Sequence, residues 1–167
     1  MRNFVQNLLA LILRMETIVA FVAFVAMTVA LSADVIGREV FSEGVFGAVR
    51  FSLFALILCA MAGFGLATAN GAHLRPRFLD FLTERTLRRP AARAGNLLSA
   101  IILGTFVYAA WKMVSFSLVI GETDLMLGIP MWPIQMAIPV GFGLSAIRYL
   151  IYALYPDLAP EEGVLAE

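Results

Sequence analysis

The chain has 167 residues, of which 61% are hydrophobic and only 14% are charged, and its formal net charge is zero. This composition excludes an ordinary soluble domain. The single cysteine, Cys59, and the single histidine, His73, exclude an internal dithiol centre and a bis-histidine haem site built from this chain alone.

Four charge-free stretches of the sequence are long enough to cross a bilayer. They lie between Glu16 and Asp34, Arg50 and His73, Arg93 and Lys112, and Asp124 and Arg148. At 1.5 Å of rise per residue, the second stretch alone would span roughly 33 Å as a helix, against a hydrocarbon core of about 30 Å. Their continuous apolar character excludes the alternating pattern of a β-barrel. The sequence therefore predicts one domain, residues 1–167, an all-α membrane protein with four transmembrane helices.

Residues 3–14 form an amphipathic pattern before the first span. One face carries Phe4, Val5, Leu8, Leu11 and Ile12, and the other carries Asn3, Gln6, Asn7 and Arg14. Such a pattern predicts an interfacial helix along the cytoplasmic surface. The alternative is that this segment simply extends the first span.

The first span is predicted over residues 16–35, ending near Gly37 and Arg38. A cleaved signal peptide is the competing interpretation, because Leu31-Ser32-Ala33 loosely resembles a cleavage site. However, residues 17–33 form a longer charge-free run than the usual apolar region of about 7–15 residues. An exposed hairpin follows, with four residues that break helices: Ser42, Glu43, Gly44 and Gly47.

The second span is predicted over residues 49–70 and ends at Asn70-Gly71, a helix C-terminal signal. A second amphipathic interfacial helix is predicted over residues 74–89, with Pro90 closing it. The third and fourth spans are predicted over residues 94–120 and 132–155. Pro139 lies inside the fourth span and should kink it.

Charges are segregated between the two ends of the spans. The loop after the second span carries Arg75, Arg77, Arg85, Arg88, Arg89 and Arg93 against Asp80 and Glu84. The loop between the third and fourth spans carries only Glu122 and Asp124. Arg2 and Arg14 precede the first span, and Arg148 lies near the end of the fourth. The positive-inside rule therefore places both termini in the cytoplasm.

Groups that could carry chemistry inside the spans are scarce. Every acidic residue is expected at a span end or in a loop, so a buried carboxylate of the kind a proton-coupled exporter needs is not predicted. Lys112 is the one charge well inside an apolar context. Beside Trp111 and Tyr108 it is either a snorkelling residue of an aromatic belt or a cation that faces a partner or a recess.

Small residues recur every fourth position on two spans. The second span carries Ala55, Cys59, Gly63, Ala67 and Gly71, and the fourth carries Ala137, Gly141 and Ser145. Such stripes let helices approach closely. They indicate either packing within this chain or docking to another subunit.

The order of several motifs resembles a known family. They are Arg38 after the first span, Gly71-Ala72-His73-Leu74-Arg75 after the second, Leu127-Gly128-Ile129-Pro130-Met131-Trp132 before the fourth, and Ile138-Pro139-Val140-Gly141-Phe142 within it. The combination is similar to the small membrane subunit (Q subunit, DctQ-like family) of tripartite ATP-independent periplasmic (TRAP) transporters, over roughly residues 30–155. Family members usually open the second span with a Trp and a Glu pair, whereas this chain reads Val45-Phe46-Gly47-Ala48-Val49-Arg50.

The resemblance implies a multi-pass protein of the bacterial inner membrane that is not an enzyme and binds no cofactor itself. It implies a large membrane subunit with sodium and substrate sites, a periplasmic binding protein that delivers an organic acid, and this chain as a static scaffold. The residues expected to pack on the large subunit are Ala55, Cys59, Gly63, Ala67, Ala137, Gly141 and Ser145. Those expected to dock the binding protein are Arg38, Glu39, Glu43, Glu122 and Asp124. Trp111, Lys112 and Trp132 are expected to anchor the chain at the membrane interface.

Two other classes of protein remain open at this point. A stand-alone four-span transporter working as a dimer should place an ionisable residue on the dimer axis, for which Lys112 is the candidate. A membrane anchor for a redox or signalling enzyme should offer histidine or cysteine ligands.

Overall fold

The computed structural model describes residues 2–70 and 88–159, which are almost entirely helical. The helices are α1 (Arg2–Phe41), α2 (Ala48–Ala69), α3 (Arg88–Ile120), α4 (Trp132–Gln135) and α5 (Ala137–Leu154), followed by a 3₁₀ turn, η2 (Pro156–Leu158). Four segments are long and apolar enough to cross a membrane: Val5–Phe41, Ala48–Ala69, Arg93–Ile120 and Trp132–Leu154. The predicted all-α fold with four transmembrane helices is confirmed.

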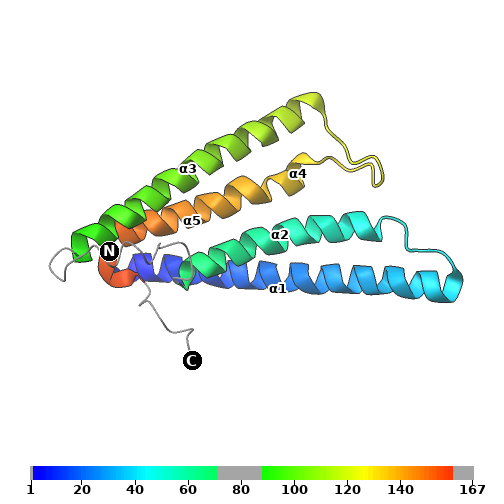
Figure 1. Ribbon diagram of the computed structural model, residues 1–167, viewed down its shortest axis with the longest axis horizontal. Coiled ribbons are helices and arrows are strands. Elements are labelled where there is room, and N and C mark those ends of the chain that lie inside the picture. The colour runs from blue at the N-terminus through cyan, green and yellow to red at the C-terminus, as the bar shows by residue number, and fades with distance from the viewer. Residues whose placement is uncertain (1, 71–87, 160–167) are drawn as a thin grey trace.

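The helices lie in a row rather than in a closed bundle, in the order α1, α2, α5, α3 (Figure 1). α1 packs along α2, α3 packs along α5, and the two pairs meet where α2 contacts α5. Apolar side chains such as Phe21 and Phe116 are about two-thirds exposed because each helix keeps a face outside the row. α1 begins and α5 ends at the same end of the molecule, as four crossings require.

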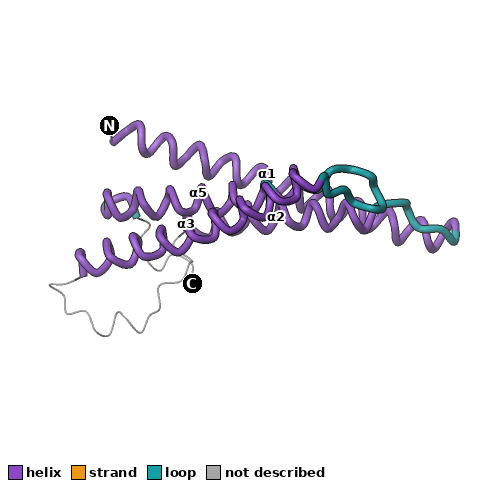
Figure 2. Tube along the Cα trace, turned by 90° about the horizontal axis from the view of Figure 1, so that it is seen from above, coloured by secondary structure: helices purple, strands orange, loops and turns teal. Residues whose placement is uncertain are grey.

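α1 is one continuous helix through residues 3–14 and beyond the expected end of the first span. Its N-terminal end stands apart from the ends of α3 and α5 (Figure 2). The continuity matches the alternative in which this segment extends the first span. A position along the membrane surface, like the cytoplasmic placement of the termini, stays a prediction.

α1 overhangs α2 at both ends. Glu16 of α1 lies against Gly65 of α2, so in this antiparallel pair Arg50 is level with about residue 31 and Ala69 with about residue 12. Since α2 begins at Ala48, level with about residue 33, about eight residues of α1 project past α2 at the hairpin end and ten at the other, roughly 12 and 15 Å of helix.

The breaks between helices have local causes. The first hairpin turns at Ser42 (φ 58°) and Gly47 (φ 77°), two of the predicted helix breakers, which adopt left-handed backbone conformations. In the last span the helix is interrupted at Met136, between α4 and α5. Pro139 has no N–H to bond the carbonyl three to four residues earlier, which explains a break just upstream of it.

The second connection differs from the prediction in one respect. α3 begins at Arg88 and includes Pro90 in its first turn, where proline is tolerated, instead of starting near residue 94. The interfacial helix predicted over residues 74–89 falls largely outside the described residues.

Candidate functional site

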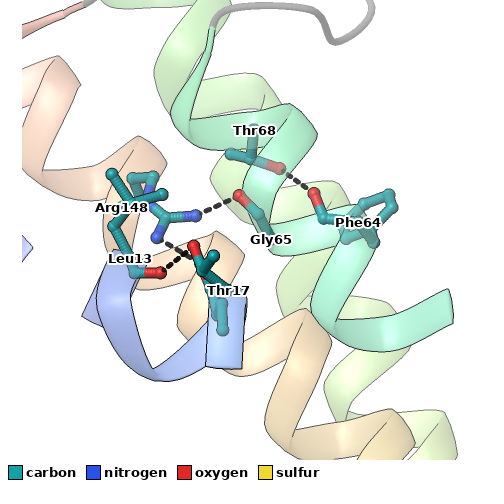
Figure 3. Close-up of polar contacts among 7 residues, drawn as sticks. Leu13, Thr17, Phe64, Gly65, Thr68 and Arg148 are labelled. Atoms are coloured by element: carbon teal, nitrogen blue, oxygen red, sulfur yellow. Dashed lines mark hydrogen bonds and ion pairs between the residues drawn. The ribbon is translucent and has the colours of Figure 1, made fainter. Parts of the chain in front are cut away.

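A buried ion pair joins three helices near the end of the molecule that carries the N-terminus. Arg148 of α5 donates from Nη2 to Oε2 of Glu16 in α1 at 2.7 Å, and the two side chains are only 1% and 6% exposed. Its Nη1 donates to the carbonyl of Gly65 in α2 at 2.5 Å (Figure 3). One guanidinium therefore links α5 to α1 across the backbone of α2. We call this group, Glu16, Gly65 and Arg148, the inner clamp.

The inner clamp depends on the missing side chain at Gly65. A Cβ atom built there would overlap the carboxylate of Glu16, so only glycine leaves room for it. The nearby hydroxyls of Thr17 and Thr68 donate to carbonyls of their own helices, at 2.8 and 2.9 Å, and do not compete for the ion pair. A charge-assisted bond of this length in a low-dielectric setting is a strong one.

Both clamp residues lie elsewhere than the sequence predicts. Glu16 was expected at a span end, yet α1 continues for fourteen residues before it and its side chain is buried. Arg148 was counted with the basic residues that face the cytoplasm, yet it is 1% exposed inside the protein. The sequence signal for this pair is that Glu16 precedes the first charge-free stretch and Arg148, of opposite charge, follows the fourth. Pairing them required knowing that α1 and α5 flank the same point of α2.

The first hairpin is braced by a second ion pair. Arg38 Nε lies 3.0 Å from Asp34 Oδ2 one turn earlier on α1. The aspartate is buried, whereas the arginine side chain is 62% exposed. Gly44 of the hairpin lies directly over this pair, since a Cβ there would come within 2.6 Å of Asp34 Oδ1. Arg38 thus braces the hairpin while part of it remains accessible.

The second hairpin folds back onto the first through Asp124. This buried carboxylate accepts the backbone N–H groups of Met126 and Leu127 at 3.0 and 2.9 Å. Its other oxygen lies 3.8 Å from Arg50 Nε of α2. Leu127 packs on Gly47, where an added Cβ would be 2.5 Å from Leu127 Cδ2. We call these contacts the outer latch. They join the loop between α3 and α4 to the start of α2.

The residues expected to dock a soluble partner therefore differ in what they offer. Glu39, Glu43 and Glu122 are exposed, and Glu122 also accepts a hydrogen bond from Gln135 at 3.2 Å. Asp124 is 6% exposed and is occupied by the outer latch. Its carboxylate therefore offers little exposed charge to a partner, and its part in docking stays a prediction.

The small residues also divide into two groups. Gly141 and Ser145 are buried within the chain, and a Cβ at Gly141 would lie 3.0 Å from Met61 Cβ of α2. Gly141 thus serves the packing of α5 on α2, one of the two alternatives that the sequence left open. Ala55 is likewise buried. By contrast, nothing lies within 4 Å of a Cβ built on Gly63, and Cys59, Ala67 and Ala137 are half-buried.

The expected interface anchors lie on the outside of the helices. Trp111 and Trp132 are 53% and 38% exposed. Lys112 is exposed, with its ammonium 5.1 Å from the centre of the Tyr108 ring, a cation–π contact. Two shallow grooves on the helix surfaces, one along α1 and one between α3 and α5, are lined by apolar side chains alone. Lys112 lines neither groove.

Comparison with known proteins decides the family. Residues 27–158 match the family described as "Tripartite ATP-independent periplasmic transporters, DctQ component". The chain belongs to this family. It is also similar to the ectoine TRAP transporter small permease protein TeaB of Halomonas elongata, with 26% identity over 144 residues, which is 86% of this chain and 75% of the relative.

Family membership places the four spans in the inner membrane of a bacterium, as the small permease subunit of a TRAP transporter. TRAP small subunits in general work with a large membrane subunit and a binding protein. The matched range contains Arg148, Gly65 and both outer hairpins, whereas Glu16 precedes it. The partner of Arg148 thus comes from a part of the chain that the family match does not cover.

Proposed function

We propose that this chain is the static scaffold of a sodium-driven TRAP transporter that imports an organic acid. In this proposal it packs against the large subunit and helps to dock the binding protein. The observation that carries the proposal is the inner clamp: the deeply placed carboxylate of Glu16 is already neutralised by Arg148 and held between three helices.

The state of Glu16 supports a structural rather than a transporting role. A carboxylate that binds a moving cation must exchange its partner during each cycle. Glu16 instead has a fixed arginine at 2.7 Å, and removing either charge would leave the other buried and unpaired. Together with the bond from Arg148 to the Gly65 carbonyl, this bond joins α1, α2 and α5, which is what a scaffold requires.

The substrate is proposed to be a small solute that carries a carboxylate. The named relative is an ectoine transporter subunit, and the chemistry that would recognise the solute is assigned here to the large subunit and the binding protein. This chain contributes position, and Gly63, with open space above it, marks the face of α2 proposed to meet the large subunit.

The exposed acids are proposed to steer the binding protein during docking. Rim charges act mainly on association rate and are screened by salt. We expect Glu122→Lys to slow uptake at low ionic strength more than at high. Equal uptake by this variant and the parent at every salt concentration would leave docking to the large subunit.

Reconstitution tests the proposal as a whole. Liposomes with a sodium gradient should accumulate radiolabelled organic acid when they contain this chain, the large subunit and the binding protein encoded with it. Liposomes with this chain alone should accumulate none. Sodium-driven uptake by the isolated chain, or full uptake by the large subunit and binding protein without it, would contradict a scaffold role.

A further inference from the structure

The end of the first hairpin carries four exposed apolar side chains that the family role does not explain. They are Val40 (65% exposed), Phe41 (75%), Val45 (48%) and Phe46 (77%). We call this group the outer tip. Large apolar side chains gathered at this exposure mark either a membrane contact or a protein contact.

The position of Phe41, at the far end of the outer tip, argues against a membrane contact. α2 has 22 residues, about 33 Å, so its ends at Ala48 and Ala69 lie near the two borders of the hydrocarbon core. Phe41 projects about 12 Å past the level of Ala48, because α1 runs about eight residues further. Even a tilt of about 40° leaves roughly 9 Å, more than the roughly 5–8 Å of headgroups on one side of a bilayer.

The charge around the outer tip argues in the same direction. The two hairpins, residues 34–50 and 121–131, carry five acidic and two basic residues. Both bases are in ion pairs with aspartates, Arg38 with Asp34 and Arg50 with Asp124. The acids left over are Glu39, Glu43 and Glu122. Segments that bind bilayer surfaces combine aromatic residues with lysine and arginine, the opposite pattern.

The outer tip is also held in place. Its hairpin is fixed by the Asp34–Arg38 pair beneath Gly44 and by a hydrogen bond from the N–H of Ala48 to the carbonyl of Val45. The outer latch ties it to the second hairpin, which ends short of the first in Figure 1. Presenting rigid aromatic side chains costs little conformational entropy on binding, as in the hot spots of protein interfaces.

We infer that the outer tip is a docking knob for the soluble binding protein, inserted into an apolar recess whose rim is basic. This inference rests on the proposed function and adds to it. Phe41 and Phe46 supply most of the affinity for the binding protein, whereas the surrounding acids raise its association rate. It also predicts a recess with lysine or arginine around it on the partner.

The test measures binding of the transporter's own binding protein to the complex of small and large subunits in lipid nanodiscs. Phe41→Ser and Phe46→Ser should each raise Kd at least tenfold. Substitution of the surrounding acids, Glu39, Glu43 and Glu122, should affect mainly the association rate. Leu125→Ser is the matched control, since Leu125 is fully exposed on the shorter second hairpin, and it should leave Kd unchanged. Unchanged Kd in both phenylalanine variants, or an equal loss in the control, would overturn the inference.

A second measurement separates the other occupants. A bimane label on Phe46→Cys, in a Cys59→Ala background, should be quenched by aqueous iodide and protected when the binding protein is added. Quenching by doxyl-labelled lipid would assign the tip to the bilayer, and protection by the large subunit alone would assign it to that subunit; either overturns the inference. If no complex with the large subunit forms at all, the proposed function fails, while the label on the isolated chain still reports water or lipid at the tip.

Discussion

The inner clamp predicts a large loss of stability when one of its charges is removed. Arg148→Met deletes the 2.7 Å bond to Glu16 and the bond to the Gly65 carbonyl, and it leaves a buried carboxylate without a partner. Removing one member of a buried pair typically costs about 3–5 kcal/mol. Methionine fills much of the same space, so the loss reports the charge rather than a cavity.

A double-mutant cycle separates charge from packing. Glu16→Met should destabilise the chain by a similar amount, because Arg148 would keep only the Gly65 carbonyl. The double variant Glu16→Met/Arg148→Met leaves no buried charge and should fall within about 1 kcal/mol of the parent. The coupling energy is then several kcal/mol, well above the roughly 0.5 kcal/mol scatter of independent sites.

The assay is the free energy of unfolding of the purified chain in mild detergent, titrated with a denaturing detergent and followed by the fluorescence of Trp111 and Trp132. Arg38→Met is the matched control. Its ion pair also joins an arginine to a buried acid, but the arginine is 62% exposed, so the loss should stay below about 1 kcal/mol. A double variant as unstable as the sum of the single ones would refute the reasoning, as would a neutral Arg148→Met.

Three further predictions concern neighbouring contacts. Gly65→Ala should lower the melting temperature of the isolated chain, because the new methyl overlaps the Glu16 carboxylate, while uptake falls only as far as folded protein is lost. Gly141→Leu should likewise reduce stability, because the leucine would push α5 away from Met61. Gly63→Leu should leave stability unchanged and reduce co-purification with the large subunit. The reverse result would contradict the assignment of Gly141 to internal packing and of Gly63 to the subunit interface. Asp124→Asn keeps the oxygen that accepts the Met126 and Leu127 N–H groups and should unfold near the parent temperature, whereas Asp124→Ala should cost about 1–2 kcal/mol, measured by the same titration.

Much of the fold could be predicted from sequence patterns because a segment that crosses a membrane has few alternatives to a helix. Charge-free stretches of the right length gave the number of spans, and the breakers between Ser42 and Gly47 gave the first hairpin. Boundaries were less well predicted. α1 continues past Gly37 because the hairpin packs against it, with the Glu43 carbonyl 2.9 Å from a Cβ position on Gly37. That contact is tertiary and leaves no trace in periodicity.

The candidate site was harder to predict because its residues have ambiguous local contexts. An arginine six or seven residues from the end of an apolar span is usually an interface residue, so the sequence predicts Arg148 on the cytoplasmic side. The small-residue stripes showed close approach without showing the neighbour, and Gly63 and Gly141 turned out to face different surroundings. Asp124 was read as a loop acid because its backbone partners, two and three residues ahead, form only once the hairpin folds.

The clamp and the latch act at opposite ends of the same row of helices, and together they explain how so open an arrangement stays rigid. α1 and α2 form one pair, α3 and α5 the other, and the pairs meet mainly along α2 and α5. Packing along a single seam would let the pairs rotate about it. The inner clamp opposes that rotation by tying α5 across α2 to α1, and the outer latch opposes it by tying the α3–α4 loop to the start of α2.

The strength of the outer latch lies in the capped Asp124 turn and the Leu127–Gly47 contact rather than in charge, because Arg50 is half-exposed and its distance to Asp124 is long at 3.8 Å. A row held at both ends keeps the faces of all four helices open to lipid or to a larger partner, while its outer tip keeps a fixed position relative to the helices.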